Sequence, residues 1–403
     1  MDFSLQPVSD AGATLVSRCE AHEATLSARA DKYDREGRFP EENTTDLIHS
    51  GVMSATVPEE FGGLGVVALR DHAAGMNRLG RGDGSTAIAT NMHLWSAWMT
   101  ARAWRAARIV GDTHREQALA AILREIASGQ RIVAVLATEN GNFVLNPTTG
   151  AVRGDEGWYL SGSQAFATGS PVATHFAVRF RFRSDTGAWR IGGATIARDS
   201  PGVTMLDNWD ALGMRGSGSH DVVLENCFIP DGAIMDGGKW GELTPYYMGV
   251  SISGVMGLVA VFLGIAEAAR ALVLQQIGSR GRGDRPAIQH LVAEMEVSLA
   301  AARAALERSA SIADRLFEAH PLSVPDDALR HVTAEFQGTK HFVTRKAIEI
   351  VDHAMSLSGG AGFLSANPLS RLYRDVRAGP LMQPFSQFEA LELIGKVALG
   401  LPV

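Results

Sequence analysis

Residues 210–230 read DALGMRGSGSHDVVLENCFIP. A turn rich in glycine and serine leads into DVVLENCFIP, a run rich in valine and isoleucine that is typical of a β-strand. Several short segments of this kind, separated by Gly, Asp and Asn, fill residues 131–237. Among them, HFAVRFRF at 175–182 alternates apolar and polar residues, as a half-buried strand does. The region therefore predicts a central β domain.

Both flanks of this region are helical in texture. Residues 1–130 contain runs rich in Ala, Glu and Arg, and residues 238–403 contain PAIQHLVAEMEVSLAAARAAL, whose apolar residues recur at helical spacing. Because the strands do not alternate with helices, this order argues against a Rossmann or barrel fold. It favours an α+β chain, with domains expected at 1–130, 131–237 and 238–403.

Residues 250–266, VSISGVMGLVAVFLGIA, are apolar enough to resemble a membrane span. The run is slightly short for one and continues directly into Glu267 and Arg270. We expect a helix that is apolar on all sides and buried inside a helical bundle. A membrane span is the alternative.

Composition and charge argue against several classes of protein. The 403 residues carry a formal net charge of -7 and two cysteines, with no long basic block. We therefore expect no nucleic-acid partner and no disulfide scaffold. The start of the chain lacks the pattern of a signal peptide, so we expect a soluble, cytoplasmic protein. No dinucleotide-binding glycine turn, nucleophile elbow or metal-ligand spacing is present, and no metal is expected.

Five segments, in order, resemble the acyl-CoA dehydrogenase superfamily. They are PEEFGGLGV at 58–66, ATEN at 137–140, GWYLSGSQAFATGS at 157–170, the stretch 210–230 quoted above, and SLSGGAGFLSANPLSRLYRDVRAG at 356–379. The resemblance implies an N-terminal helical domain, a central β-barrel-like domain and a C-terminal four-helix bundle. It also implies a flavin cofactor, FAD or FMN.

The resemblance assigns flavin-binding roles by position in these motifs. Phe166 would stack on the isoalloxazine ring, and Thr138 and Thr168 would hydrogen-bond its edge. From the residues alone, an ordinary core aromatic of a strand is the better interpretation of Phe166. The far end of the cofactor would be approached, across the interface of a homotetramer or dimer, by Arg280, Gly359, Gly360 and Gln387.

The sequence departs from the family where the dehydrogenases carry their base. There a glutamate removes the α-proton of an acyl thioester, but Gln383, in QPFSQ, stands at that position. Some relatives carry the base on the first helix of the C-terminal domain, where this chain has Gly254. Neither an amide nor a glycine can act as a general base. The charged residues that grip coenzyme A are missing as well.

These departures favour the oxygen-using branch of the superfamily. Such a monooxygenase takes reduced flavin from a separate reductase and oxygenates a small substrate that is not a coenzyme A ester. His93, in TNMHLW, lies where several such relatives carry a histidine beside the flavin, so we predict catalytic roles for His93 and Gln383. A packed helix histidine is the alternative for His93. Two other functions stay open: an FAD-dependent acyl-CoA or acyl-carrier dehydrogenase with a displaced base such as Glu389, and a flavin-binding scaffold without catalysis.

Overall fold

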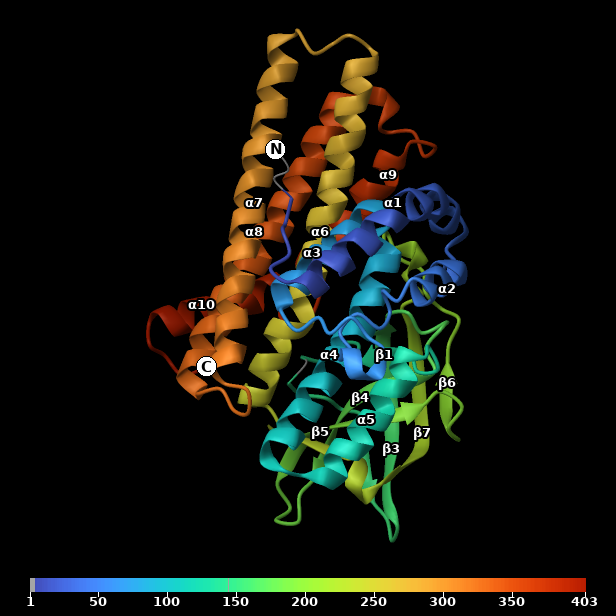
Figure 1. The fold of residues 1–403 in the computed structure, drawn as a ribbon, viewed down its shortest axis with the longest axis vertical. Coiled ribbons are helices and arrows are strands. Elements are labelled where there is room, and N and C mark those ends of the chain that lie inside the picture. The colour runs from blue at the N-terminus through green and yellow to red at the C-terminus, as the bar shows by residue number, and fades with distance from the viewer. Residues whose placement is uncertain (1–3, 144) are drawn as a thin grey trace.

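The computed structural model describes residues 4–143 and 145–403 and has the predicted order of helices, strands and helices (Figure 1). The N-terminal helices are α1 (Asp10–Glu36), α2 (Glu41–His49), α3 (Leu69–Gly82), α4 (Gly84–Val110) and α5 (Thr113–Ala127). The C-terminal helices are α6 (Pro245–Ser279), α7 (Pro286–Ala319), α8 (Asp326–Ser358), α9 (Pro368–Asp375) and α10 (Gln387–Ala398). Short 3-10 turns lie at η1 (Glu59–Phe61), η2 (Arg215–Ser217), η3 (Asp231–Ala233), η4 (Gly359–Ala361) and η5 (Val376–Leu381).

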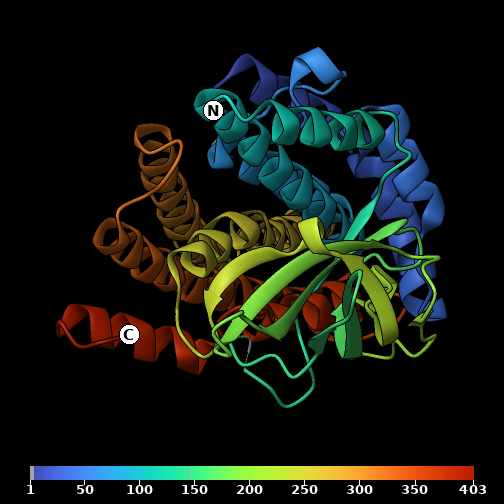
Figure 2. The ribbon, with the colours of Figure 1, turned by 90° about the horizontal axis from the view of Figure 1, so that it is seen from below.

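The predicted central β domain is confirmed as one eight-stranded sheet, seen from below in Figure 2. Its strands are β1 (Val133–Leu136), β2 (Gly150–Arg153), β3 (Gly157–Ala167), β4 (His175–Arg183), β5 (Trp189–Ala197), β6 (Val203–Met205), β7 (His220–Pro230) and β8 (Met235–Lys239). The hydrogen-bonded order is β6-β7-β3-β2-β4-β5-β8, and β1 pairs with β4 in parallel. Alternation in β4 buries Phe176, Val178 and Phe180 in the core of this domain.

Helix α6 carries the apolar run and is the central helix of the fold. By length and composition it could cross a membrane, but 89% of its most apolar window is buried inside the protein. It packs against α3 of the N-terminal domain and α8 of the C-terminal domain. One hydrophobic core therefore runs through both helical domains, and the expectation of a buried helix is confirmed.

Helices α3 and α6 approach closely because glycine lies on both sides of their contact. A Cβ atom at Gly264 of α6 would lie 2.3 Å from the carbonyl oxygen of Asn77, and one at Gly80 of α3 would lie 2.6 Å from the carbonyl oxygen of Val261. The atoms met are backbone atoms, which cannot move aside as the end of a flexible side chain can. The contact between α3 and α6 therefore accepts no residue larger than glycine at these two positions.

We predict that Gly264→Ala destabilises the fold by about 1–3 kcal/mol, because the added methyl group forces α3 and α6 apart. Gly278→Ala is the matched control, since the same helix leaves open space around Gly278. That variant should be neutral or more stable by up to about 1 kcal/mol, through helix propensity alone. Urea unfolding measures both, and equal stability of the two variants would contradict a close helix contact.

His93 of α4 joins the helical and sheet domains. Its Nε2 lies 2.9 Å from the carbonyl oxygen of Met53, and its Nδ1 accepts from the backbone N–H of Val133, 3.2 Å away, at the start of β1. Both contacts require the neutral ring with its proton on Nε2. Burial lowers the pKa of His93 to about 4, although the bond to Met53 opposes the shift.

We predict a loss of stability as pH falls from 6.5 towards about 4. In this window the unfolded chain binds a proton at His93 and the folded chain does not, so the unfolded state gains up to about 3 kcal/mol from this group. His93→Gln should flatten that part of the pH dependence measured by urea unfolding. The exposed His114→Gln variant controls for the loss of a histidine as such. An unchanged slope in His93→Gln would refute the assignment.

Candidate active site

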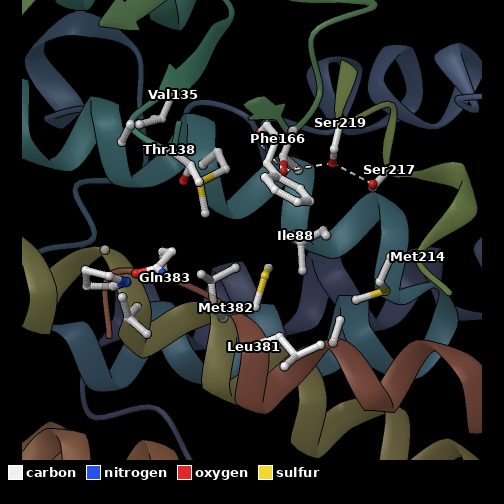
Figure 3. A pocket seen from close by; sticks show the side chains of 18 of the residues that line it. Ile88, Val135, Thr138, Phe166, Met214, Ser217, Ser219, Leu381, Met382 and Gln383 are labelled. Atoms are coloured by element: carbon white, nitrogen blue, oxygen red, sulfur yellow. Dashed lines mark hydrogen bonds between the residues drawn. The ribbon is translucent and has the colours of Figure 1, made fainter. Parts of the chain in front are cut away.

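A cavity of about 430 Å³ lies where the three domains meet. Its walls come from α4, from the ends of β1 and β3, from β4, from the loop that precedes β7, from α6, and from the segment running from α9 to Pro384 (Figure 3). Segments distant in the sequence are thus brought together, because the sheet domain closes over the open side of the helices.

The wall of the cavity is mainly apolar, with side chains such as Ile88, Met92, Val135 and Leu381. Its polar groups are few, as in sites that bind organic cofactors and substrates. Among the described residues that line it, none is Asp or Glu, whereas three are arginines: Arg179, Arg374 and Arg377. These described residues therefore offer a ligand cations, hydroxyl groups and one amide, Gln383, and no carboxylate.

Thr138, Phe166 and Thr168, the three residues predicted to face the flavin ring, all line this cavity. The N–H of Ala165 donates to the carbonyl oxygen of Thr138 over 2.8 Å, which holds the end of β1 beside the end of β3. Phe166 has a φ of 58°, and 52% of its surface is exposed. A bulky residue with positive φ is uncommon and is often found at functional sites.

A chain of hydroxyl groups continues from Thr168 across the cavity wall. Thr168 Oγ1 lies 2.9 Å from Ser219 Oγ, which lies 2.7 Å from Ser217 Oγ (Figure 3). The ring of Phe166 meets Trp209 edge to face, with centroids 5.8 Å apart. An isoalloxazine needs an apolar slot with hydrogen-bonding groups along one edge, and this arrangement of flat rings and hydroxyls fits it.

Gln383 also lines the cavity, in the loop after η5. Its Oε1 is buried and has no hydrogen-bond partner within the described structure. The loop is held by Lys340 of α8, whose Nζ donates to the carbonyl oxygens of Met382 and Phe385. Burial lowers the pKa of Lys340 to about 7. A buried acceptor without a partner, on a tightly held loop, is expected to serve a ligand.

Among the described residues, no alternative carboxylate base lines this cavity. Glu389 accepts from the backbone N–H of Ser386 over 2.7 Å and so caps the start of α10. Glu139 is buried; burial alone would raise its pKa, but hydrogen bonds from Thr148 and Thr149 outweigh that effect and lower it. Both carboxylates therefore hold backbone in place. At Gly254, which lines the cavity, an added Cβ would lie 2.9 Å from the indole of Trp95, so a glutamate there would require Trp95 to move.

The remaining predicted residues lie outside this cavity. His93 is not in its wall, because both ring nitrogens bind backbone behind it. The ends of α6 and α8 meet through a hydrogen bond between Gln276 and Ser358, and Arg280, Gly359 and Gly360 follow there, all exposed. Gln387 begins α10, close to the loop that Lys340 holds. The structure thus brings together the three residues predicted to face the flavin ring. It separates them from His93 and from the residues predicted to approach the far end of the cofactor.

Other cavity residues were not singled out from the sequence. Ser217 and Ser219 belong to the quoted GSGSH turn, and only the fold shows that their hydroxyls reach Thr168. Trp209 lies one residue before the stretch 210–230, DALGMRGSGSHDVVLENCFIP. For Arg179 a signal did exist, since the alternation of HFAVRFRF places it on the face of β4 opposite the phenylalanines.

Comparisons with known proteins cover nearly the whole chain. Three domain models of the acyl-CoA dehydrogenases match it: the N-terminal domain at residues 19–103, the middle domain at 135–227 and the C-terminal domain at 256–386. L-evernosamine nitrososynthase from a Micromonospora species is 34% identical, over 98% of this chain and 92% of that protein.

Two further relatives also match over nearly the full length of the chain. Amino sugar nitrososynthase DnmZ of Streptomyces peucetius is 32% identical over 98% of this chain and 95% of its own length. A solved structure of KijD3, in complex with FMN and a dTDP-linked 3-amino-4-keto sugar, is 33% identical with a TM-score of 0.92, covering 100% of this chain and 98% of the other. With the flavin-fitting cavity, these matches establish that the chain belongs to the acyl-CoA dehydrogenase family and is a flavin-dependent oxidoreductase.

Proposed function

We propose that this chain is a flavin-dependent monooxygenase that oxidises the amino nitrogen of a sugar carried on a nucleoside diphosphate. One observation carries the proposal: among its described residues, the cavity wall has an amide, Gln383, and no carboxylate. Removal of an α-proton from a thioester requires a base within hydrogen-bond reach. Oxidation of an amine removes no proton from carbon, because the lone pair of the neutral nitrogen is itself the nucleophile.

The chain's own residues would hold the reactants in place. Bound reduced flavin would supply the electrons that activate molecular oxygen. Phe166 would cover the ring, and the hydroxyls of Thr138 and Thr168 would hydrogen-bond its polar edge. The apolar wall would exclude water from the reaction. The unpartnered Oε1 of Gln383 would accept a hydrogen bond from the substrate's amine and so orient its lone pair.

His93 enters this proposal as a positioning residue. It lies on α4, which also carries Ile88 and Met92 of the cavity wall, and it binds the first residue of β1, the strand that leads to Thr138. The histidine would therefore fix the distance between the apolar wall and the flavin edge, without touching either reactant.

The similarity to nitrososynthases supports the substrate class. Two relatives are named for amino sugars, and the KijD3 structure holds one linked to dTDP. Identity of 32–34% extends over nearly the full length of each chain, so the substrate cavity lies within the matched region. We infer a dTDP-linked amino sugar, or a close analogue, as the substrate.

The proposal extends to a partner protein, a cellular compartment and an oligomeric state. A separate flavin reductase would deliver the reduced flavin, and the chain would act in the cytoplasm as a homotetramer or dimer. In that assembly Arg280, Gly359 and Gly360 would approach the cofactor of a neighbouring subunit. Both glycines have open space around them, which a close backbone approach requires. Gln387 would contact the same part of the cofactor.

We predict that the protein N-oxidises a dTDP-amino sugar when a flavin reductase regenerates reduced flavin in the presence of oxygen. Mass spectrometry with isotopically labelled oxygen should find the label on nitrogen. Gln383→Leu should lower kcat/KM about fivefold, the effect of one lost hydrogen bond. Gln117→Leu, exposed on α5, should have no effect. Rapid bleaching of oxidised flavin by acyl-CoA without oxygen, with no amine oxidation, would instead establish a dehydrogenase.

A second prediction tests the flavin placement. Thr168→Val should weaken flavin binding about fivefold, since it removes one hydrogen bond of about 1 kcal/mol. Thr45→Val, exposed on α2, should bind flavin as the unchanged protein does. Fluorescence titration with FMN and FAD gives these affinities. If Phe166→Ala combined with Thr168→Val retained full flavin affinity, the ring would have to lie elsewhere.

A further inference from the structure

Arg179 is the one arginine of strand β4 that lines the cavity. Along this strand Phe176, Val178 and Phe180 are buried in the sheet core, so the intervening side chains face the other way. Arg181 lies on that same face two residues further on, where its guanidinium stacks on Trp189, outside the cavity. The alternating pattern thus directs one arginine into the cavity and another beyond it.

The guanidinium of Arg179 is fixed from two sides. Its Nη2 donates to the carbonyl oxygen of Ala137, next to Thr138, and its Cζ lies 5.1 Å from the ring centroid of Tyr247 on α6. Its Nε is buried and has no hydrogen-bond partner among the described residues. A buried N–H of a cation without an acceptor is costly, so this donor is expected to serve a ligand.

The other two arginines of the cavity are already neutralised. Arg374 donates to Asp34 over 2.9 Å, and Arg377 donates to Asp352 over 2.6 Å. Among the described residues, no Asp or Glu forms an ion pair with Arg179. Glu139 lines a small neighbouring pocket together with Arg179, but its oxygens accept from Thr148, Thr149 and Gln164.

Two more buried polar atoms belong to residues that line the same cavity as Arg179. Among the described residues, the buried hydroxyl of Tyr247 faces Arg179 without a well-formed hydrogen bond, and the buried Oε1 of Gln383 has no partner. The ring of Tyr247 packs on Phe385, with centroids 6.4 Å apart, and Phe385 follows Gln383 by two residues. A cation, a phenol and an amide therefore succeed one another along one side of the same cavity.

We propose that Arg179 binds the diphosphate of a nucleotide-linked substrate, while Gln383 meets its amine and Tyr247 the sugar between them. This inference rests on the proposed function. A guanidinium can present parallel N–H groups to phosphate oxygens, and a charge-assisted pair is strong where the surroundings are apolar. An anion would satisfy the buried Nε and neutralise a charge that the protein leaves without a carboxylate.

The test compares Arg179→Met, Arg179→Lys and the matched control Arg181→Met, using dTDP, thymidine and FMN as probes. Isothermal titration calorimetry should show that Arg179→Met weakens dTDP binding at least about tenfold, while Arg179→Lys loses less because it keeps the charge. Thymidine and FMN affinities should be unchanged in both variants, and Arg181→Met should match the unchanged protein. Thermal unfolding of each variant verifies that it is folded.

Each other outcome overturns the assignment. If Arg179→Met binds dTDP within about twofold of the unchanged protein, the diphosphate lies elsewhere and the proposed function is unaffected. If FMN affinity falls and dTDP affinity does not, the cation serves the flavin. If the unchanged protein binds no dTDP and oxidises no dTDP-amino sugar, the proposed function itself fails. Loss of dTDP binding in Arg179→Met but equal loss in Arg181→Met would indicate only a general effect of surface charge.

Discussion

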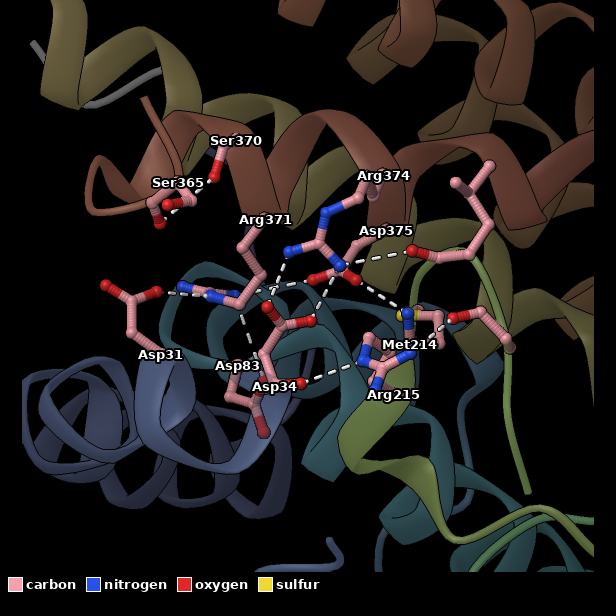
Figure 4. A network of polar contacts seen from close by, with 12 residues as sticks. Asp31, Asp34, Asp83, Met214, Arg215, Ser365, Ser370, Arg371, Arg374 and Asp375 are labelled. Atoms are coloured by element: carbon pink, nitrogen blue, oxygen red, sulfur yellow. Dashed lines mark hydrogen bonds and ion pairs between the residues drawn. The ribbon is translucent and has the colours of Figure 1, made fainter. Parts of the chain in front are cut away.

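A buried carboxylate, Asp375, holds the three domains around the cavity. It accepts from the backbone N–H of Met214 over 2.6 Å and faces the guanidinium of Arg371, 3.5 Å away (Figure 4). Burial raises the pKa of Asp375 to about 6, although the attraction of Arg371 opposes the shift. Arg371 also binds Asp31 of α1 and faces Asp83, which caps α4. Such a network is strongly destabilised if one member is lost, since a buried charge would remain unpaired.

The same network determines the shape of the site. Met214 lines the cavity, and the loop that carries it also carries Ser217 and Ser219. Arg374, next to Asp375, donates to Asp34 and to the carbonyl oxygen of Leu212, so it fixes this loop from a second side. The position of the hydroxyl chain beside Thr168 is thus a consequence of ion pairs formed by helices of the two flanking domains (Figure 4). A flavin edge can be recognised precisely only where such a shell keeps the contacting groups rigid.

The sequence predicts those features whose cause is local. Helix α6 is apolar on every side, so its burial follows from composition. The resemblance to acyl-CoA dehydrogenase motifs, and no local pattern, predicts the placing of Thr138, Phe166 and Thr168, and all three line the cavity. Contacts between residues far apart in the sequence could not be predicted from local sequence patterns. His93 binds backbone at positions 53 and 133, forty residues away in either direction, and only the packed structure shows that its nitrogens face those groups. Arg179 could be assigned to one face of its strand, but which element covers that face depends on the order of the strands.

Function in this fold depends on a few side chains that the scaffold tolerates in more than one form. The loop of Gln383 is held through backbone carbonyls by Lys340, and its following helix is capped by Glu389, so neither support depends on whether residue 383 is an amide or a carboxylate. Either an amide or a carboxylate at this position therefore leaves these supports of the loop unchanged. The chemical difference between the two side chains is large, because a cavity with this apolar wall and these hydroxyls has no group to take a proton from carbon when residue 383 is an amide. In the proposed function such a cavity would orient a substrate that supplies its own lone pair, and the cation at Arg179 would give that substrate a second point of attachment, so that a single orientation is favoured.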